Sequence, residues 1–231
     1  MAIALVTNTS VAAHSGGTSG AVNTTGGVLL TAGLAAFPAA SVSDSKGNVW
    51  TSVGSQVQFW TADLQYVNNP TVGSGHTFTL TGTYCSLVAA AWSGTNTSSP
   101  FDAKVGASGG SGTFPYTFQA GSITPAVANS LVVAQLVSNN GTNGNPTIDS
   151  GFTVLASGDG SGPNIALYGN AYLVPDTAAV NPTWSNLSGA GLNTAAINAV
   201  FKPAAASGGG PLIAGGELTH GILIRAGRLA A

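Results

Sequence analysis

Thr77-Phe78-Thr79-Leu80-Thr81 decides the fold, because apolar and polar side chains alternate along it residue by residue. Successive side chains of a β-strand point to opposite faces, so Phe78 and Leu80 share one face and the threonines share the other. The alternation predicts a strand with one buried face. Residues 56–59 show the same period, with the glutamines expected outward, and residues 197–201 repeat it near the end of the main domain.

Three longer runs are apolar at nearly every position and predict central strands that are covered on both faces. They are residues 87–92, 131–137 and 165–174. Clusters of Gly, Asn, Asp and Pro separate the runs, and residues 44–48 are typical of a hairpin turn. About a dozen short strands at this spacing between Ala2 and Phe201 predict an all-β, jelly-roll-like antiparallel β-sandwich.

The composition supports a packed β-protein with few ionisable groups. Hydrophobic residues make up 44% of the 231 positions, and charged residues make up only 5%, against roughly 25% in ordinary soluble domains. The 33 glycines and 11 prolines disfavour long helices. A net charge of -2 offers no electrostatic attraction to nucleic acid or to an anionic membrane, so neither is an expected partner.

The sequence also bears on targeting, membrane insertion and disulfide formation. The first residues lack a basic region followed by a long apolar stretch, so we expect no signal peptide. No apolar stretch approaches the roughly 18 residues that a membrane helix needs. Cys85 is the only cysteine and lies in an apolar run, which predicts a buried, unreactive thiol and no intrachain disulfide.

The composition changes after Pro203 and divides the chain into three parts. Residues 1–203 are the predicted sandwich domain, residues 204–210 are a linker of small residues, and residues 211–231 are a predicted C-terminal anchoring arm. Such an arm cannot bury its own apolar side chains, so we expect it to bind a neighbouring protein. The expected partner-binding residues are Leu212, Ile213, Leu218, Ile222, Ile224, Arg225, Arg228 and Leu229.

Several weak motifs in a fixed order resemble a known family. They are Val42-Ser43-Asp44-Ser45-Lys46-Gly47-Asn48-Val49-Trp50-Thr51, Gly75-His76-Thr77-Phe78-Thr79-Leu80-Thr81, Leu87-Val88-Ala89-Ala90-Ala91-Trp92-Ser93-Gly94 and residues 124–133. Together they resemble the jelly-roll domains of virion proteins of tailed bacteriophages, and residues 210–221 are similar to a glycine- and leucine-rich tail of phage structural proteins.

The resemblance covers roughly residues 40–203 and the arm, and it carries no catalytic residues. It implies a capsid decoration (cement) or head-fibre protein on the exterior of the virion. The implied partners are the major capsid protein or another virion protein, together with further copies of the chain, with a trimer favoured. The resemblance implies no cofactor, and whether the chain attaches to the head or the tail stays open.

Catalytic motifs are scarce, and we expect no enzymatic activity. Gly106-Ala107-Ser108-Gly109-Gly110 matches the G-x-S-x-G pattern, but a nucleophile elbow needs a helix after the serine, and here a glycine-serine loop follows. His14, His76 and His220 lack the spacing of a compact zinc site, so solvated or capping roles are expected. The carboxylates are dispersed. A calcium site at Asp44 and Asn48 is conceivable, and a simple turn there is the preferred interpretation.

The tryptophans leave a second function open. Trp60 falls on the side of its strand that we assign to the glutamines, so we expect it to face solvent or a neighbouring molecule. Trp92 lies in an apolar run and is expected in the core. An exposed tryptophan surrounded by Ser, Thr and Asn can stack on a sugar ring. The alternative function is therefore a glycan-binding adhesin or receptor-binding module.

Overall fold

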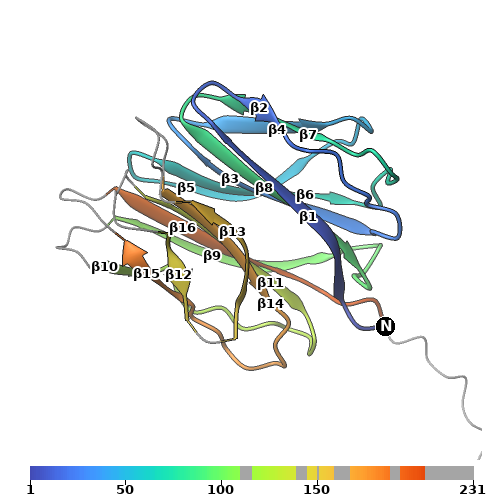
Figure 1. Cartoon of the computed structure of the whole chain (residues 1–231). Helices are drawn as coiled ribbons and strands as arrows, with labels where there is room; N and C mark the ends of the chain where they lie inside the picture. Colours follow the sequence, from blue (N-terminus) through green and yellow to red (C-terminus); the bar gives the residue numbers. More distant parts are fainter. Residues whose placement is uncertain (110–115, 139–144, 150, 159–166, 188–192, 206–231) are drawn as a thin grey trace, which may run out of the picture.

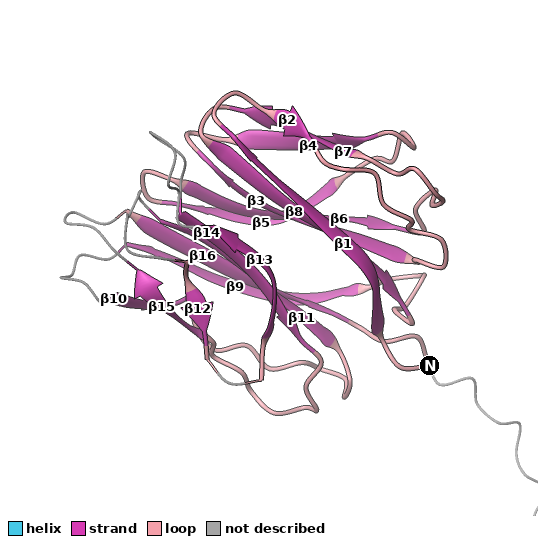
Figure 2. Cartoon of the chain, in the orientation of Figure 1, coloured by secondary structure: helices cyan, strands magenta, loops and turns pink. Residues whose placement is uncertain are grey.

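The computed structural model describes residues 1–109, 116–138, 145–149, 151–158, 167–187 and 193–205. These residues form strands, turns and loops without a helix (Figure 2), which confirms the prediction of an all-β sandwich. Ala204 and Ala205 of the predicted linker are described. The rest of the linker and the whole predicted arm, with its eight expected partner-binding residues, lie outside the described residues.

The strands fall into two consecutive sets of eight. The first set is β1 Ala4–Ala13, β2 Gly17–Thr18, β3 Leu29–Ala36, β4 Ala40–Asp44, β5 Thr51–Val57, β6 Thr61–Asn68, β7 Phe78–Gly82 and β8 Cys85–Ser93. The second set is β9 Phe101–Gly109, β10 Tyr116–Gln119, β11 Leu131–Ser138, β12 Thr147–Ile148, β13 Thr153–Gly158, β14 Leu167–Leu173, β15 Thr183–Leu187 and β16 Thr194–Phe201.

The two sets have the same topology, so the chain is built from two eight-stranded repeats. The first repeat forms a five-stranded sheet in the order β1-β8-β3-β6-β5 and a three-stranded sheet in the order β2-β7-β4. Adding eight to each strand number gives the sheets of the second repeat, β9-β16-β11-β14-β13 and β10-β15-β12. All of the pairs are antiparallel.

The register of the strands repeats as well. The first residue of the middle strand pairs with an aromatic residue in both halves, Leu29 with Trp92 and Leu131 with Phe201. Each edge strand next to β6 or β14 carries one β-bulge at the same place, between Ser52 and Gly54 in β5 and between Val154 and Ala156 in β13. Equal order, equal register and equal bulges identify the halves as structural repeats.

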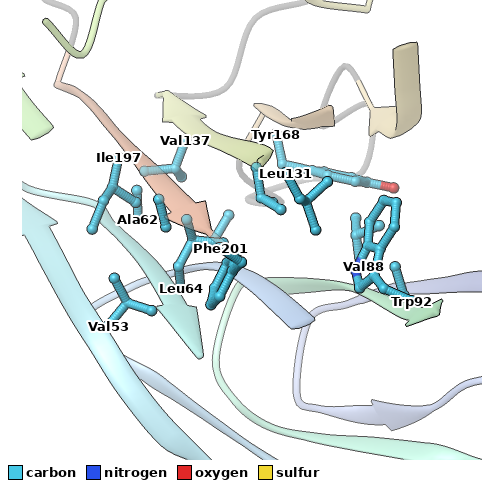
Figure 3. Close-up of a cluster of buried hydrophobic side chains, with 14 of the residues drawn as sticks. Val53, Ala62, Leu64, Val88, Trp92, Leu131, Val137, Tyr168, Ile197 and Phe201 are labelled. Carbon is cyan, nitrogen blue, oxygen red and sulfur yellow. The ribbon is translucent and has the colours of Figure 1, made fainter. Parts of the chain in front are cut away.

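The four sheets stack as layers, with the two five-stranded sheets in the middle and a three-stranded sheet on each outer side (Figure 1). One cluster of buried side chains fills the space between the five-stranded sheets (Figure 3). Smaller clusters lie between each five-stranded sheet and its outer sheet. Strands β3, β8, β11 and β16 are buried on both faces. The apolar runs in the sequence predicted this for β8 and β11, and the run at residues 165–174 is buried from Leu167 to Ala171 and partly exposed from Tyr172 to Val174. The prediction of a half-buried strand at residues 197–201 is wrong, because β16 packs between the two neighbouring layers and is buried throughout.

Reciprocal contacts show that an approximate two-fold rotation relates the repeats. Trp92 packs edge-on against Tyr172 with ring centroids 4.8 Å apart, and Phe201 packs edge-on against Tyr66 at 5.5 Å. Trp92 corresponds to Phe201, and Tyr66 corresponds to Tyr172, because their registers match. Each repeat therefore contributes the same surface to the contact, as in a symmetric dimer.

Gly33 and Gln135 occupy equivalent positions and meet between the repeats. A Cβ atom on Gly33 would lie 2.1 Å from the Gln135 Oε1 and 2.3 Å from the Asn170 Nδ2. The Gln135 Oε1 accepts a hydrogen bond of 2.8 Å from the Asn170 Nδ2, and the Gln135 Nε2 donates to the Leu136 carbonyl at 3.1 Å. Space near the symmetry axis admits one long side chain, and glycine leaves room for it.

The molecule has two distinct ends. At one end, which we call the terminal pole, Ala4 pairs with Ser93 and the N-terminus lies beside the exit of the last described residues (Figure 1). At the other end, the loop pole, Ala13 pairs with Cys85. The loops at residues 14–16, 37–39, 58–60 and 83–84 lie there. Ten residues of β1 separate the poles, which corresponds to about 30 Å.

Candidate interaction surfaces

The buried Asp44 carboxylate organises the turn after β4. Its Oδ1 accepts hydrogen bonds from the Lys46 backbone N–H at 2.9 Å and from the Asn48 Nδ2 at 3.1 Å. Its Oδ2 accepts one from the Trp50 Nε1 at 2.9 Å. The segment is a turn, as predicted, but not a hairpin, because β4 pairs with β7 while β5 pairs with β6.

These contacts do not fit the conceivable calcium site. Both Asp44 oxygens face N–H donors, and the Asn48 Oδ1 accepts the Thr71 backbone N–H at 2.7 Å. A cation needs oxygen lone pairs that are free to point at it. The preferred interpretation as a simple Asx turn is therefore confirmed.

His76 is completely buried, so of the solvated or capping roles expected for it, the solvated one is wrong. Its Nε2 lies 3.2 Å from the Asp44 Oδ1, and its Nδ1 lies 2.9 Å from the Thr24 Oγ1. The ring also stacks on Phe78 with centroids 4.5 Å apart. The hydroxyl, imidazole and carboxylate resemble a catalytic triad in composition, but all three are sealed from solvent. The network holds β4, β7 and the residue 24 loop together.

Ser108 lies within the extended strand β9 and pairs with Ala195. A nucleophile elbow requires a sharp turn from strand to helix at the serine, and Ser108 has no such backbone. Within the described part of the chain, no group of three His, Cys, Asp or Glu side chains could hold a metal ion. The Cys85 thiol is buried, and this burial raises its pKa, as expected of an unreactive thiol.

An aromatic ledge occupies the loop pole of the first repeat. It consists of His14, Phe37, Phe59, Trp60 and Tyr84, which come from four different loops. The Phe37 and Phe59 rings stack at 4.4 Å with an interplanar angle of 22°. Trp60 packs edge-on against both Phe37 and Tyr84, and Tyr84 packs edge-on against His14.

Trp60 is buried, with 5% of its surface exposed, so the expectation that it faces solvent or a neighbour is wrong. Strand β5 ends at Val57, and a tight turn follows in which the Gln58 N–H donates to the Trp60 carbonyl. Extending the alternation of β5 through this turn therefore places Trp60 on the exposed face, which is the wrong one. Val57 and Phe59 are the exposed residues instead, at 56% and 51%.

A cleft of about 620 Å³ lies at the terminal pole. Met1, Val127 and Pro203 give it an apolar lining, and Asn96, Asn129 and Lys202 line it with polar groups. The chain leaves the sandwich from this cleft. Its exit is fixed, because the Lys202 N–H donates to the Pro100 carbonyl and the Ala204 N–H donates to the Gly94 carbonyl, both at 2.7 Å.

Comparisons with family models, with curated proteins and with solved structures found no match for the chain. Within the described ranges, no helix is both long and apolar enough to cross a membrane. His14 is exposed on the ledge, and His220 lies outside the described residues, as does the predicted arm. The aromatic ledge and the terminal cleft are thus the two surfaces on which a function can be argued.

Proposed function

We propose that the chain is a structural virion protein of a tailed bacteriophage, a capsid decoration or head-fibre protein that attaches to the assembled shell. The observation that carries this proposal is that the two ends of the molecule differ. The chain leaves the sandwich at one fixed point beside an apolar cleft, and a segment rich in Leu and Ile follows. An attachment arm at one pole leaves the other pole free to face outward.

The topology agrees with the jelly-roll part of this proposal. A jelly roll alternates its strands between two sheets, which gives the orders 1-8-3-6 and 2-7-4-5. Both repeats have the first order and the first three strands of the second, while the fifth strand joins the larger sheet beside the sixth. We interpret each repeat as a jelly-roll variant in which the bulged fifth strand has changed sheets.

The test of attachment is a deletion of residues 208–231. We expect at least tenfold fewer copies of the truncated protein on purified particles, counted by quantitative mass spectrometry, with an unchanged β-sheet circular dichroism spectrum. A matched full-length variant, with Leu212, Ile213 and Leu218 changed to Ser, keeps the length of the arm and removes apolar contacts. It should also attach poorly. Undiminished occupancy of both variants would show that the arm does not anchor the protein.

Assembly with further copies remains part of the proposal, with a trimer as the favoured state. Sedimentation of the full-length protein measures the oligomeric state directly, and a monomer at micromolar concentration contradicts the expected assembly.

A glycan-binding role is the second candidate function. It cannot rest on Trp60 as the stacking residue, because that side chain is buried, and it is favoured instead by the exposed part of the aromatic ledge.

A further inference from the structure

We propose that the aromatic ledge at the loop pole binds a neutral saccharide, with Phe59 as the ring on which the sugar stacks. Phe59 is the one aromatic side chain among the exposed large apolar residues of the described chain. The inference names a site and a ligand class for the second candidate function. It does not depend on attachment through the arm.

The ledge presents a flat and rigid ring to solvent. The inner face of Phe59 is stacked on Phe37 at an angle of 22°, so its outer face is the accessible one. Trp60 packs edge-on against both phenylalanines from beneath, with centroids 5.6 and 6.2 Å from them. A ring held in this way loses little conformational entropy when a ligand covers it. A pyranose offers a flat patch of C–H groups, which matches the electron-rich face of the ring.

The rim of the ledge can donate and accept hydrogen bonds without carrying a fixed charge. His14, Gln58 and Thr83 are exposed around the aromatic rings. Residues 14–16, 37–39, 58–60 and 83–84 contain no Asp, Glu, Lys or Arg. Hydroxyl groups of a neutral sugar fit amide, imidazole and hydroxyl partners, whereas a charged ligand would find no Asp, Glu, Lys or Arg partner in these loops.

The size of the exposed patch favours a sugar over a protein partner. A stable protein interface buries about 800 Å² on each side, while one fully buried aromatic side chain contributes about 150–250 Å². Phe59 is the one exposed phenylalanine, tryptophan or tyrosine ring of the ledge. One or two sugar units would cover such a patch. The ledge also lies at the pole opposite Ala205, where the described chain ends, so attachment at that end would leave the ledge accessible.

The experiment screens the full-length protein on an array of neutral and charged glycans, then measures the best neutral ligand by titration. We expect Phe59→Ala to weaken binding at least tenfold and Phe59→Trp to preserve it. Val49→Ala is the matched control, because Val49 is an 83% exposed apolar residue in the β4–β5 loop, and it should bind as the wild type does. Thermal unfolding of each variant checks that the fold is retained.

Three outcomes would overturn the proposal: no neutral glycan bound by the wild type, equal binding by Phe59→Ala, or equal loss in Phe59→Ala and Val49→Ala. Self-association that Phe59→Ala abolishes, without any glycan signal, would identify the ledge as a protein interface and also contradict it. The protein lacking residues 208–231 should keep its glycan affinity. Failure of attachment and failure of glycan binding are therefore measured separately.

Discussion

Asp63 is one of the few charged residues of the chain, and its ionisation should affect the stability of the fold measurably. Its side chain accepts hydrogen bonds from the Ser52 Oγ at 3.1 Å and the Gln65 Nε2 at 2.8 Å. Burial nevertheless raises its pKa above the ordinary value of 3.8, and these bonds and the nearby Lys104 ammonium only partly oppose the rise. The folded state therefore binds the proton more tightly than the unfolded chain does.

This shift predicts that Asp63 destabilises the fold as the pH rises. Its contribution is most favourable below 3.8 and is lost as the pH increases through the raised pKa of the folded state. Asp63→Asn removes the half-buried charge, so we expect it to increase the free energy of unfolding near pH 7 and to flatten its pH dependence. Urea unfolding at about pH 4 and pH 7 measures both. A variant less stable than the wild type at neutral pH would contradict the sign.

Single residues were predictable where local chemistry decides their environment. The Asx turn at Asp44 and the buried thiol of Cys85 both follow from their immediate neighbours. The burial of Trp60 and His76 could not be predicted, because each is buried by loops from distant parts of the sequence. Tyr84 reaches Trp60, and Thr24 reaches His76, only after the sheets have formed.

At the level of the strands, hydrogen bonds to the bulged edge strands connect the two repeats. The Lys104 ammonium of β9 donates to the carbonyl of Val53, the bulge residue of β5, at 2.6 Å. The equivalent Asn8 of β1 donates to the carbonyl of Leu155, the bulge residue of β13, at 3.1 Å. A bulge leaves its residue out of the ladder, so its carbonyl needs another donor. Symmetric bulges thus create symmetric contacts between the sheets.

Lys104→Met keeps the aliphatic stem and removes the donor. We expect a loss of about 1 kcal/mol in the free energy of unfolding, because the bulge carbonyl of Val53 then has no protein partner. Lys46→Met is the matched control. Its ammonium also donates to a backbone carbonyl, that of Ser74 at 3.1 Å, but it does so within one repeat and at the surface. Chemical denaturation should show a smaller loss in the free energy of unfolding for the control. Equal losses would argue against a stabilising contact between the repeats at Lys104.

The strands themselves were readable from the sequence, whereas the repetition was not. Period-2 alternation located β7, and apolar runs located β8 and β11, because burial of a strand face constrains residue type directly. The repeats share few identities. In the middle strands only Leu29, Ala32 and Leu34 recur, as Leu131, Ala134 and Leu136. Register depends on pairing between distant strands, so equal topology leaves little trace in the residues.

On the scale of the whole molecule, the shared core makes the repeats interdependent. The central cluster draws buried residues from both five-stranded sheets, and the Trp92–Tyr172 and Phe201–Tyr66 contacts cross between them. Neither repeat can open without exposing the face that it buries against the other. The 231-residue chain should therefore unfold in one transition, although it contains two structural repeats.

Gly33→Ala tests this coupling at the point where the repeats meet. Its Cβ would collide with the Gln135 Oε1 and the Asn170 Nδ2, and moving Gln135 aside would break two buried hydrogen bonds. We expect a loss of about 1–3 kcal/mol. Gly20→Ala is the control, because no atom lies within 4 Å of the added Cβ. Hydrogen exchange should show that Gly33→Ala weakens the protection of β3 and β11 equally. Loss confined to β3 would mean that the repeats unfold separately and that their interface is a passive contact.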